Sequence, residues 1–375
     1  MMHGGGGTRF SRVSGEVSGA FGDLGTFLPH VLGVISVAGL KPGGIFTLFG
    51  IFYFFTGLFY RLPIPVQPMK VASAAIVTGK VTPPEIAGAS IMIGATLVVL
   101  GLTGVIGVIA RSIPRSVVSG IQLGLGAGLA VLGLKMVQHN LLIGCLTLLV
   151  MLPVGFNRRL PQAITGVAVG VLAGLVLGGF PPMQHMAPSL QLPHLVFPGW
   201  GDIWRGTISI GLPQLALTLT NAVIVTSTLA EHFFPENRRV APFTLALTQG
   251  GANLLSGVLG GIPMCHGAGG LASHHRFGAR TGAVGVLLGT SFLAIGLFFA
   301  DPALAFLKLI PEGTLGALLF YGALDLAIGG WAPASRWDIV VAVVVALLAF
   351  FVNPALAVVV GVAFFRFTPG SRPPG

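Results

Sequence analysis

Acidic residues are scarce in this chain of 375 residues, which has 10 aspartates and glutamates against 20 lysines and arginines. Only 8% of its residues are charged, whereas soluble domains carry roughly 25%. Apolar runs long enough to cross a bilayer recur from end to end, which indicates a polytopic membrane protein. The net charge of +10 does not indicate nucleic-acid binding, because the basic residues are scattered singly between apolar runs.

Cysteine is equally scarce, and both Cys145 and Cys265 lie in apolar segments. A disulfide framework or a thiolate metal site is therefore not expected. The sequence also lacks the HExxH and GxSxG motifs and the paired aspartates of intramembrane proteases. We predict no enzymatic activity, no cofactor and no resident metal.

Hydropathy predicts twelve full spans and two shorter apolar segments. The short segments, 66–79 and 264–275, would reach only about 18–21 Å as helices, too little to cross alone. We expect them to be half-helices, the third and tenth of fourteen transmembrane segments in an all-α protein. The full spans are 18–38, 43–60, 85–110, 115–135, 139–156, 161–180, 207–231, 240–260, 281–300, 313–331, 338–352 and 354–368.

The basic residues give this count an orientation. With both termini in the cytoplasm, fourteen arginines fall on the inner side, while one arginine and four lysines fall on the outer side. This asymmetry is the one that the positive-inside rule predicts, and it is lost if either short segment is dropped. The first residues show no compact apolar core before a small-residue cleavage site, so we expect a cytoplasmic tail.

An internal repeat appears at an offset near 198 residues, where Pro65 falls on Pro263 and Asp23 on Asn221. Seven segments per half is an odd number, so the second half must enter the membrane upside down relative to the first. We predict two inverted seven-segment repeats. The predicted divisions are an N-terminal tail at 1–17, repeats at 18–180 and 207–368, a linker at 181–206 and a C-terminal tail at 369–375.

Prolines interrupt both short segments. Pro63, Pro65 and Pro68 hold the chain extended before the first half-helix, and Pro263 precedes "MCHGAGGLAS" in the second. In inverted-repeat transporters, the N-termini of such half-helices point free backbone N–H groups at an anion. Two helix ends supply about one positive charge, and Lys70 raises the total to about +2, which matches a divalent oxyanion.

The predicted substrate site gathers around these breaks. Gln67 and His266 offer hydrogen-bond donors, while Gly267 and Gly269 let a ligand approach the backbone. A purely structural role is the alternative for two of these residues. Lys70 could extend its side chain to the membrane interface, and His266 could be a core histidine whose hydrogen bonds are made within the protein. Asn221 could line the same cavity or merely join helices. The full set is Lys70, Gln67, Met69, Cys265, His266, Gly267, Ala268, Gly269 and Asn221.

Asp23 is an intramembrane carboxylate, which is a functional candidate by default. We expect it to pair with Lys70 in the empty carrier and to take up a proton when the anion arrives; the alternative is a purely structural partner. Thr218 and Thr220 could line the cavity together with Asn221, and Thr26 and Ser73 are weaker candidates of the same kind. Solvated or structural roles near span ends are expected for Glu85, Glu231, Glu236 and Asp325. An ordinary cytoplasmic loop is expected to hold His274, His275, Arg276 and Arg280.

Three motifs, "SGAFGDLGTFLPH" (18–30), "PIPVQPMKVASAA" (63–75) and "GIPMCHGAGGLASHHRFGARTG" (261–282), resemble the molybdate transporter family, a branch related to the sulfate permeases. The resemblance implies seven-plus-seven inverted repeats, as in uracil permease-like carriers, with a core domain that moves against a gate domain. It also implies a secondary transporter for molybdate. His274 and His275 depart from the expected residues of the third motif.

We therefore predict a carrier that imports molybdate with protons across the cell (inner) membrane. A sulfate transporter of the same fold is the main alternative, because both substrates are tetrahedral dianions of nearly equal size. An anion channel is a further alternative, although the paired half-helices and the repeat favour a carrier. The sequence leaves open the coupling ion and the oligomeric state, including a homodimer.

Overall fold

The computed structural model describes residues 9–79, 81–156, 162–178, 187–329, 331 and 333–368. The regular secondary structure of this part of the chain is helical apart from two strands of two residues each, as the sequence predicts for an all-α membrane protein. The first half contains α1 (Arg9–Ala38), α2 (Pro42–Tyr60), β1 (Gln67–Pro68), α3 (Lys70–Gly79), α4 (Pro83–Thr103), α5 (Ile106–Ser112), α6 (Arg115–His139), α7 (Leu141–Phe156) and α8 (Gln162–Gly178).

The second half begins with one continuous helix of 34 residues, Trp200–Phe233, in which two π-helical pieces interrupt the α-helix. Its pieces are α9 (Trp200–Gly206), η2 (Thr207–Gly211), α10 (Leu212–Leu217), η3 (Thr218–Val225) and α11 (Thr226–Phe233). There follow α12 (Pro242–Val258), β2 (Met264–Cys265), α13 (Ala268–Arg276), α14 (Ala283–Phe298), α15 (Ala300–Leu309), α16 (Glu312–Gly329), α17 (Arg336–Phe351) and α18 (Pro354–Arg366).

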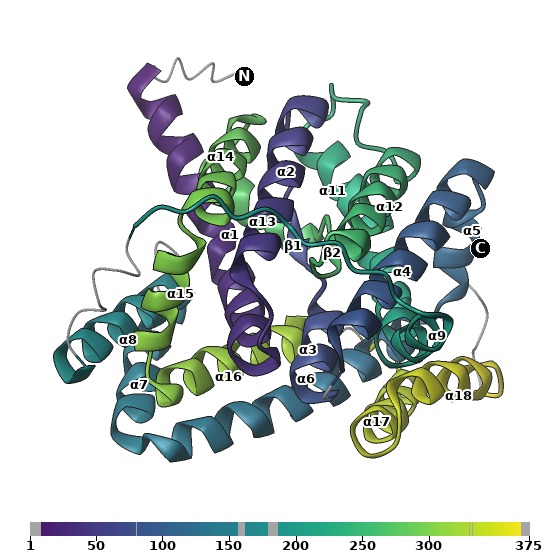
Figure 1. Cartoon of the computed structure of the whole chain (residues 1–375). Coiled ribbons are helices and arrows are strands. Elements are labelled where there is room, and N and C mark those ends of the chain that lie inside the picture. The colour runs from purple at the N-terminus through teal and green to yellow at the C-terminus, as the bar shows by residue number, and fades with distance from the viewer. Residues whose placement is uncertain are drawn as a thin grey trace.

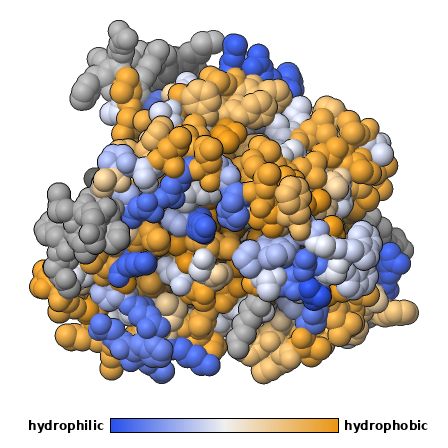
Figure 2. Space-filling view, in the orientation of Figure 1, coloured by the Kyte–Doolittle hydropathy of each residue, from blue (hydrophilic) through white to orange (hydrophobic). Residues whose placement is uncertain are grey.

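Four helices in the described residues are long and apolar enough to cross a membrane: α2, α4, α6 and Trp200–Phe233. The number rises to six if each of two bent pairs forms one span: the two parts of α1, bent by 45°, and α14 with α15, bent by 91°. Figure 2 shows the broad apolar areas that such helices present on one face of the molecule, interrupted by polar patches. The count of fourteen segments stays a prediction.

Several helix boundaries follow from local chemistry. Proline begins α2, α4, α12 and α18, a position where its missing N–H costs nothing. At the start of α4, Glu85 accepts a hydrogen bond from the Thr82 backbone N–H (2.8 Å) and pairs with Arg205 of α9 (2.6 Å). Glu85 therefore has the structural role that its position near a span end suggested.

Two predicted boundaries differ from the structure. The predicted span 85–110 is divided into α4 and α5 at Gly104, whose positive φ of 73° ends the first helix. The sequence analysis also left residues 301–312 without an element, whereas α15 occupies most of them and turns sharply away from α14. Hydropathy alone does not report such a turn, because both sides of it are apolar.

The helices form two groups. In one group α2 packs against α14 and α4 against α12; in the other α6 packs against α16 and α17, and α7 against α16. Small residues permit this closeness: a Cβ on Gly133 of α6 would lie 2.7 Å from the Gly316 carbonyl oxygen of α16. In Figure 1, α1, α2, α12 and α14 stand above α6 and α16, which run along the bottom of the view, and α3 lies between them.

An extended segment at 187–199 connects the two halves across the surface (Figure 1). Its backbone is held by the ends of two helices: Ser189 N–H donates to the Phe298 carbonyl (3.0 Å) and Val196 N–H donates to the Val258 carbonyl (2.9 Å). Its helical continuation begins at Trp200, inside the predicted linker.

Candidate functional site

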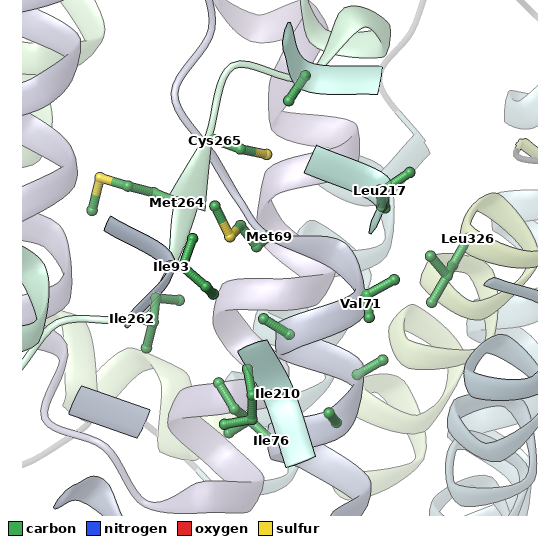
Figure 3. Close-up of a cluster of buried hydrophobic side chains, with 14 of the residues drawn as sticks. Met69, Val71, Ile76, Ile93, Ile210, Leu217, Ile262, Met264, Cys265 and Leu326 are labelled. Carbon is green, nitrogen blue, oxygen red and sulfur yellow. The ribbon is translucent and has the colours of Figure 1, made fainter. Parts of the chain in front are cut away.

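Two extended segments meet at the centre of the fold. β1 and β2 pair antiparallel, with Gln67 opposite Cys265 and Pro68 opposite Met264. The Met69 N–H also donates to the Pro263 carbonyl (2.9 Å). Directly after each strand begins a short helix, α3 or α13, of ten and nine residues. Both half-helix starts are therefore held at one crossing, where Figure 3 shows Met69 beside Met264 and Cys265.

Buried amide side chains hold this crossing in place. Asn253 of α12 donates from Nδ2 to the Met264 carbonyl (2.7 Å), and its Oδ1 accepts from the Met264 N–H (3.0 Å). Gln214 of α10 accepts from the Ala72 N–H in the first turn of α3 (2.9 Å). Extended backbone at membrane depth needs such partners, because lipid offers none. The two half-helix starts are thus fixed relative to each other.

Lys70 is the first residue of α3 and reaches α16. Its Nζ lies 2.5 Å from Oδ2 of Asp325, and the two side chains are 22% and 50% exposed. Asp325 was expected near a span end with a solvated or structural role, and its pairing with Lys70 was not predicted. A carboxylate within the apolar run of the predicted span 313–331 was the signal that could have revealed it.

Asp23 of α1 is fully buried beside β1. It accepts hydrogen bonds from Gln67 Nε2 and from the Tyr53 hydroxyl (3.1 Å), and its Oδ2 lies 3.8 Å from Nε2 of His274. The expected pairing of Asp23 with Lys70 is therefore wrong for this conformation. Lys70 has a nearer carboxylate, and Asp23 is satisfied by neutral donors.

His274 is also fully buried, and its Nδ1 is 2.8 Å from the Gly19 carbonyl of α1. The expectation of an ordinary cytoplasmic loop is wrong here, because α13 continues through Arg276. A helix that starts at Ala268 places position 274 nearly two turns on, still inside the protein. His275 stacks on Phe233, with ring centroids 4.0 Å apart.

His266 is buried and has partners at both ring nitrogens. Nδ1 lies 2.7 Å from the Pro65 carbonyl, and Nε2 lies 2.9 Å from the Thr248 hydroxyl, which in turn bonds the Tyr60 hydroxyl (2.7 Å). In this conformation His266 ties the segment before β1 to α12. Its predicted contact with an anion would require Thr248 to release Nε2.

The glycines of the second half-helix differ in their surroundings. A Cβ on Gly267 would lie 2.2 Å from Oε1 of Gln67, whereas no atom lies within 4 Å of a Cβ on Gly269. The group that closely approaches the Gly267 backbone is therefore the Gln67 side chain. Gly269 borders open space, as a residue beside a ligand would.

The remaining predicted residues lie around the crossing. Met69, Cys265 and Ala268 are buried, and the Met69 sulfur is 3.9 Å from the Thr218 hydroxyl. Asn221 is partly buried on η3, which packs against α13. His30 of α1 was not among the predicted residues; its Nδ1 lies 2.6 Å from the hydroxyl of Ser73, one turn into α3.

The arrangement can hold an anion. A lysine stands at the start of one short helix, and a glycine beside open space stands in the first turn of the other. The first N–H groups of each helix have no partner inside it, and the helix dipoles favour negative charge there. Among the described residues, this crossing combines a cation with two helix N-termini.

Solved anion transporters share this architecture. The transmembrane domain of a cyanobacterium bicarbonate transporter, BicA, aligns with a TM-score of 0.67 and 18% identity over 95% of this chain and 98% of that one. SLC26A9 aligns with a TM-score of 0.68 and 15% identity over 95% of this chain and 64% of that one. The chain is therefore a multi-pass membrane protein with the fold of these transporters.

The sequence comparisons narrow the class to one family. The family described as "Molybdate transporter of MFS superfamily" matches residues 15–129 and 206–326, one stretch in each half. Molybdate transporter 2 of Arabidopsis thaliana is 31% identical over 87% of this chain and 81% of its own length. Molybdate transporter 1 of Chlamydomonas reinhardtii is 27% identical over 83% of each. The chain belongs to the molybdate transporter family, and it is a transporter rather than an enzyme.

Proposed function

We propose that this protein imports molybdate with protons across the cell (inner) membrane, binding the dianion between the starts of α3 and α13. The observation that carries the proposal is the position of Lys70, the first residue of one half-helix, beside the crossing that brings in the other. The relatives named molybdate transporters cover most of the chain, which supports molybdate as substrate.

The charge balance supports a doubly charged substrate. Two facing helix ends contribute about one positive charge and Lys70 a second, for a total of about +2. Around the anion we place the donors and small residues of both half-helix starts. These are Lys70, Gln67, Met69, Cys265, His266, Gly267, Ala268 and Gly269, with Asn221 from η3.

The proposed framework is a pair of inverted seven-segment repeats at 18–180 and 207–368, with both termini in the cytoplasm. The packing supports it, because pairs of helices in contact have equivalent pairs under the repeat. Under the repeat, α2 corresponds to α12 and α4 to α14, so the packing of α2 on α14 is equivalent to that of α4 on α12. The packing of α6 on α17 is likewise equivalent to that of α16 on α7.

These contacts suggest how the carrier moves. We assign α1–α4 and α9–α14 to a core domain, and α6–α8 and α16–α18 to a gate domain. The half-helix α3 contacts both α6 and α16, so the proposed site borders the gate. Movement of the core against the gate would then expose the site to each side in turn.

For the coupling residue we propose Asp23. Its neighbours that can ionise are Tyr53 of α2, His274 of α13, Lys70 of α3 and Cys265 of β2. An ionised Asp23 would reduce the charge of the site to about +1, and a proton on it restores about +2 for the arriving dianion.

The test is accumulation of labelled molybdate by the purified protein in sealed vesicles, with an inward proton gradient. We expect uptake above the external concentration, recovery of unaltered molybdate, and competition by unlabelled molybdate. Uptake that never exceeds equilibrium would indicate a channel. Stronger competition by sulfate than by molybdate, compared across pH, would favour the sulfate alternative.

A further inference from the structure

We infer that Asp325 acts as a built-in anion that occupies Lys70 while the site is empty and must leave it when substrate binds. The inference rests on the proposed function and adds a residue that links substrate binding to gate movement. Asp325 would thus be a positioning residue for the transport cycle. It does not itself bind the substrate.

The pair joins parts of the protein that we assign to different domains. Lys70 begins α3, which packs against α1 and α10 of the core and also against α6, whereas Asp325 lies on α16, which packs mainly against α6 and α7 and also contacts α1. The residue after Asp325, Leu326, faces Val71 across the same contact (Figure 3). The ion pair therefore lies where a half-helix of the moving core meets a helix of the gate.

The chemistry of the pair resembles that of the proposed substrate. A carboxylate oxygen accepts a charge-assisted hydrogen bond from the lysine ammonium, as an oxygen of molybdate would. A dianion bound to Lys70 would stand within a few ångströms of the Asp325 charge and repel it. Substrate and Asp325 therefore compete for one cation.

Exposure distinguishes Asp325 from the other carboxylate near the site. The Asp325 side chain is 50% exposed, so it has room to turn away from Lys70 without entering the protein interior. Asp23 is fully buried and hydrogen-bonded by Tyr53 and Gln67, so it has no such exit. Asp325 can therefore release Lys70, and substrate binding would free α16 from α3.

After releasing its substrate, the empty carrier must return to the side where it binds the next one, and Lys70 moves with the empty site. When Asp325 compensates Lys70, the empty site moves without a free positive charge. Without that carboxylate, only the loaded carrier is compensated, because the dianion then supplies the negative charge. The inference therefore predicts different effects on net uptake, which needs the empty carrier to return, and on exchange, which uses only the loaded form.

The experiment measures molybdate binding to purified protein by calorimetry, and both uptake and molybdate exchange in vesicles. Asp325→Asn should bind molybdate about tenfold more tightly than the parent, retain exchange and lose most net uptake. Asp325→Ala provides a second neutral variant should the first fail to fold. Glu312→Gln, at the start of the same helix and paired with His139, is the matched control and should match the parent.

Unchanged affinity in both neutral variants would overturn the inference, as would an equal loss of exchange and net uptake in folded protein. If Lys70→Ala abolishes binding while Asp325→Asn binds as the parent does, the molybdate site stands and only the role of Asp325 fails. If the parent itself binds no molybdate, the proposed function fails and the inference fails with it.

Discussion

Lys70 is the residue on which the proposed site most depends. We expect Lys70→Ala and Lys70→Gln to weaken molybdate binding roughly 10- to 100-fold, because each removes a charged hydrogen-bond donor to the anion. Calorimetry on purified protein measures this. Lys308→Ala, in the last turn of α15, removes a lysine far from the crossing and should bind normally. Parental affinity in either Lys70 variant would show that the site is elsewhere.

Asp23 is the residue to which we assign the proposed proton coupling. Asp23→Asn mimics the protonated acid and reproduces the Asn221 of the other repeat. It should keep molybdate binding but lose the stimulation of uptake by low external pH, because no proton can then be taken up at this position. Uptake assays across pH measure this, with Asp338→Asn at the start of α17 as control. An unchanged pH dependence in Asp23→Asn would reject Asp23 while leaving the oxyanion site intact.

At this scale the sequence identified the charged residues more readily than their partners. Lys70 and Asp23 stand out because a charge in an apolar run needs an explanation. Which carboxylate pairs with Lys70 depends on how α16 packs, and Asp325 lies 255 residues away in the chain. His274 was missed because the end of α13 cannot be located from a segment rich in glycine and histidine.

Among the elements, the two half-helices carry the proposed function, and the glycines of α13 test it. Gly269→Val should block molybdate uptake, because the new side chain would occupy the open space beside the half-helix. Gly251→Val is a matched control on α12, since a Cβ there also meets no atom within 4 Å. Normal uptake by a well-folded Gly269→Val protein would place the anion elsewhere.

Gly267→Val is a less informative probe, because its Cβ would displace Gln67 before it met any ligand.

Both half-helices could be predicted because proline leaves a local mark on the sequence. The pairing of β1 with β2 could not, since two strands of two residues carry no periodicity and their register depends on Asn253 and the surrounding helices. The sharp turn before α15 could not be predicted either, because the residues on both sides of it are apolar and the turn depends on packing.

For the whole molecule, the proposed topology predicts on which side of the membrane each connection lies. In a Cys145→Ser background, Glu236→Cys in the α11–α12 connection should react with a membrane-impermeant thiol reagent only from the cytoplasm. Leu190→Cys, in the exposed linker, should react only from outside, because one span separates the two positions. Labelling of sealed cells and of inverted vesicles measures both. Reaction of both cysteines from one side would contradict the inverted repeat.

The membrane class could be predicted from composition, because apolar length is a one-dimensional property. The packing partners of the long helices could not be predicted. Helices such as α2, α4 and α6 present apolar residues on most sides, so hydropathy does not say which neighbours they pack against. Close glycine contacts such as that between Gly133 and Gly316 decide the partners.

The hydrogen bonds of the central crossing also impose an order on its assembly during synthesis. Asp23, Tyr53 and Gln67 lie close together in the sequence, so this buried group can form while the ribosome is still making the first half. The Met69 N–H must wait for Pro263, and Lys70 must wait for Asp325, 255 residues later. A nascent chain therefore holds Lys70 without its ion-pair partner until α16 emerges, which makes the growing polypeptide dependent on its last third for a stable interior.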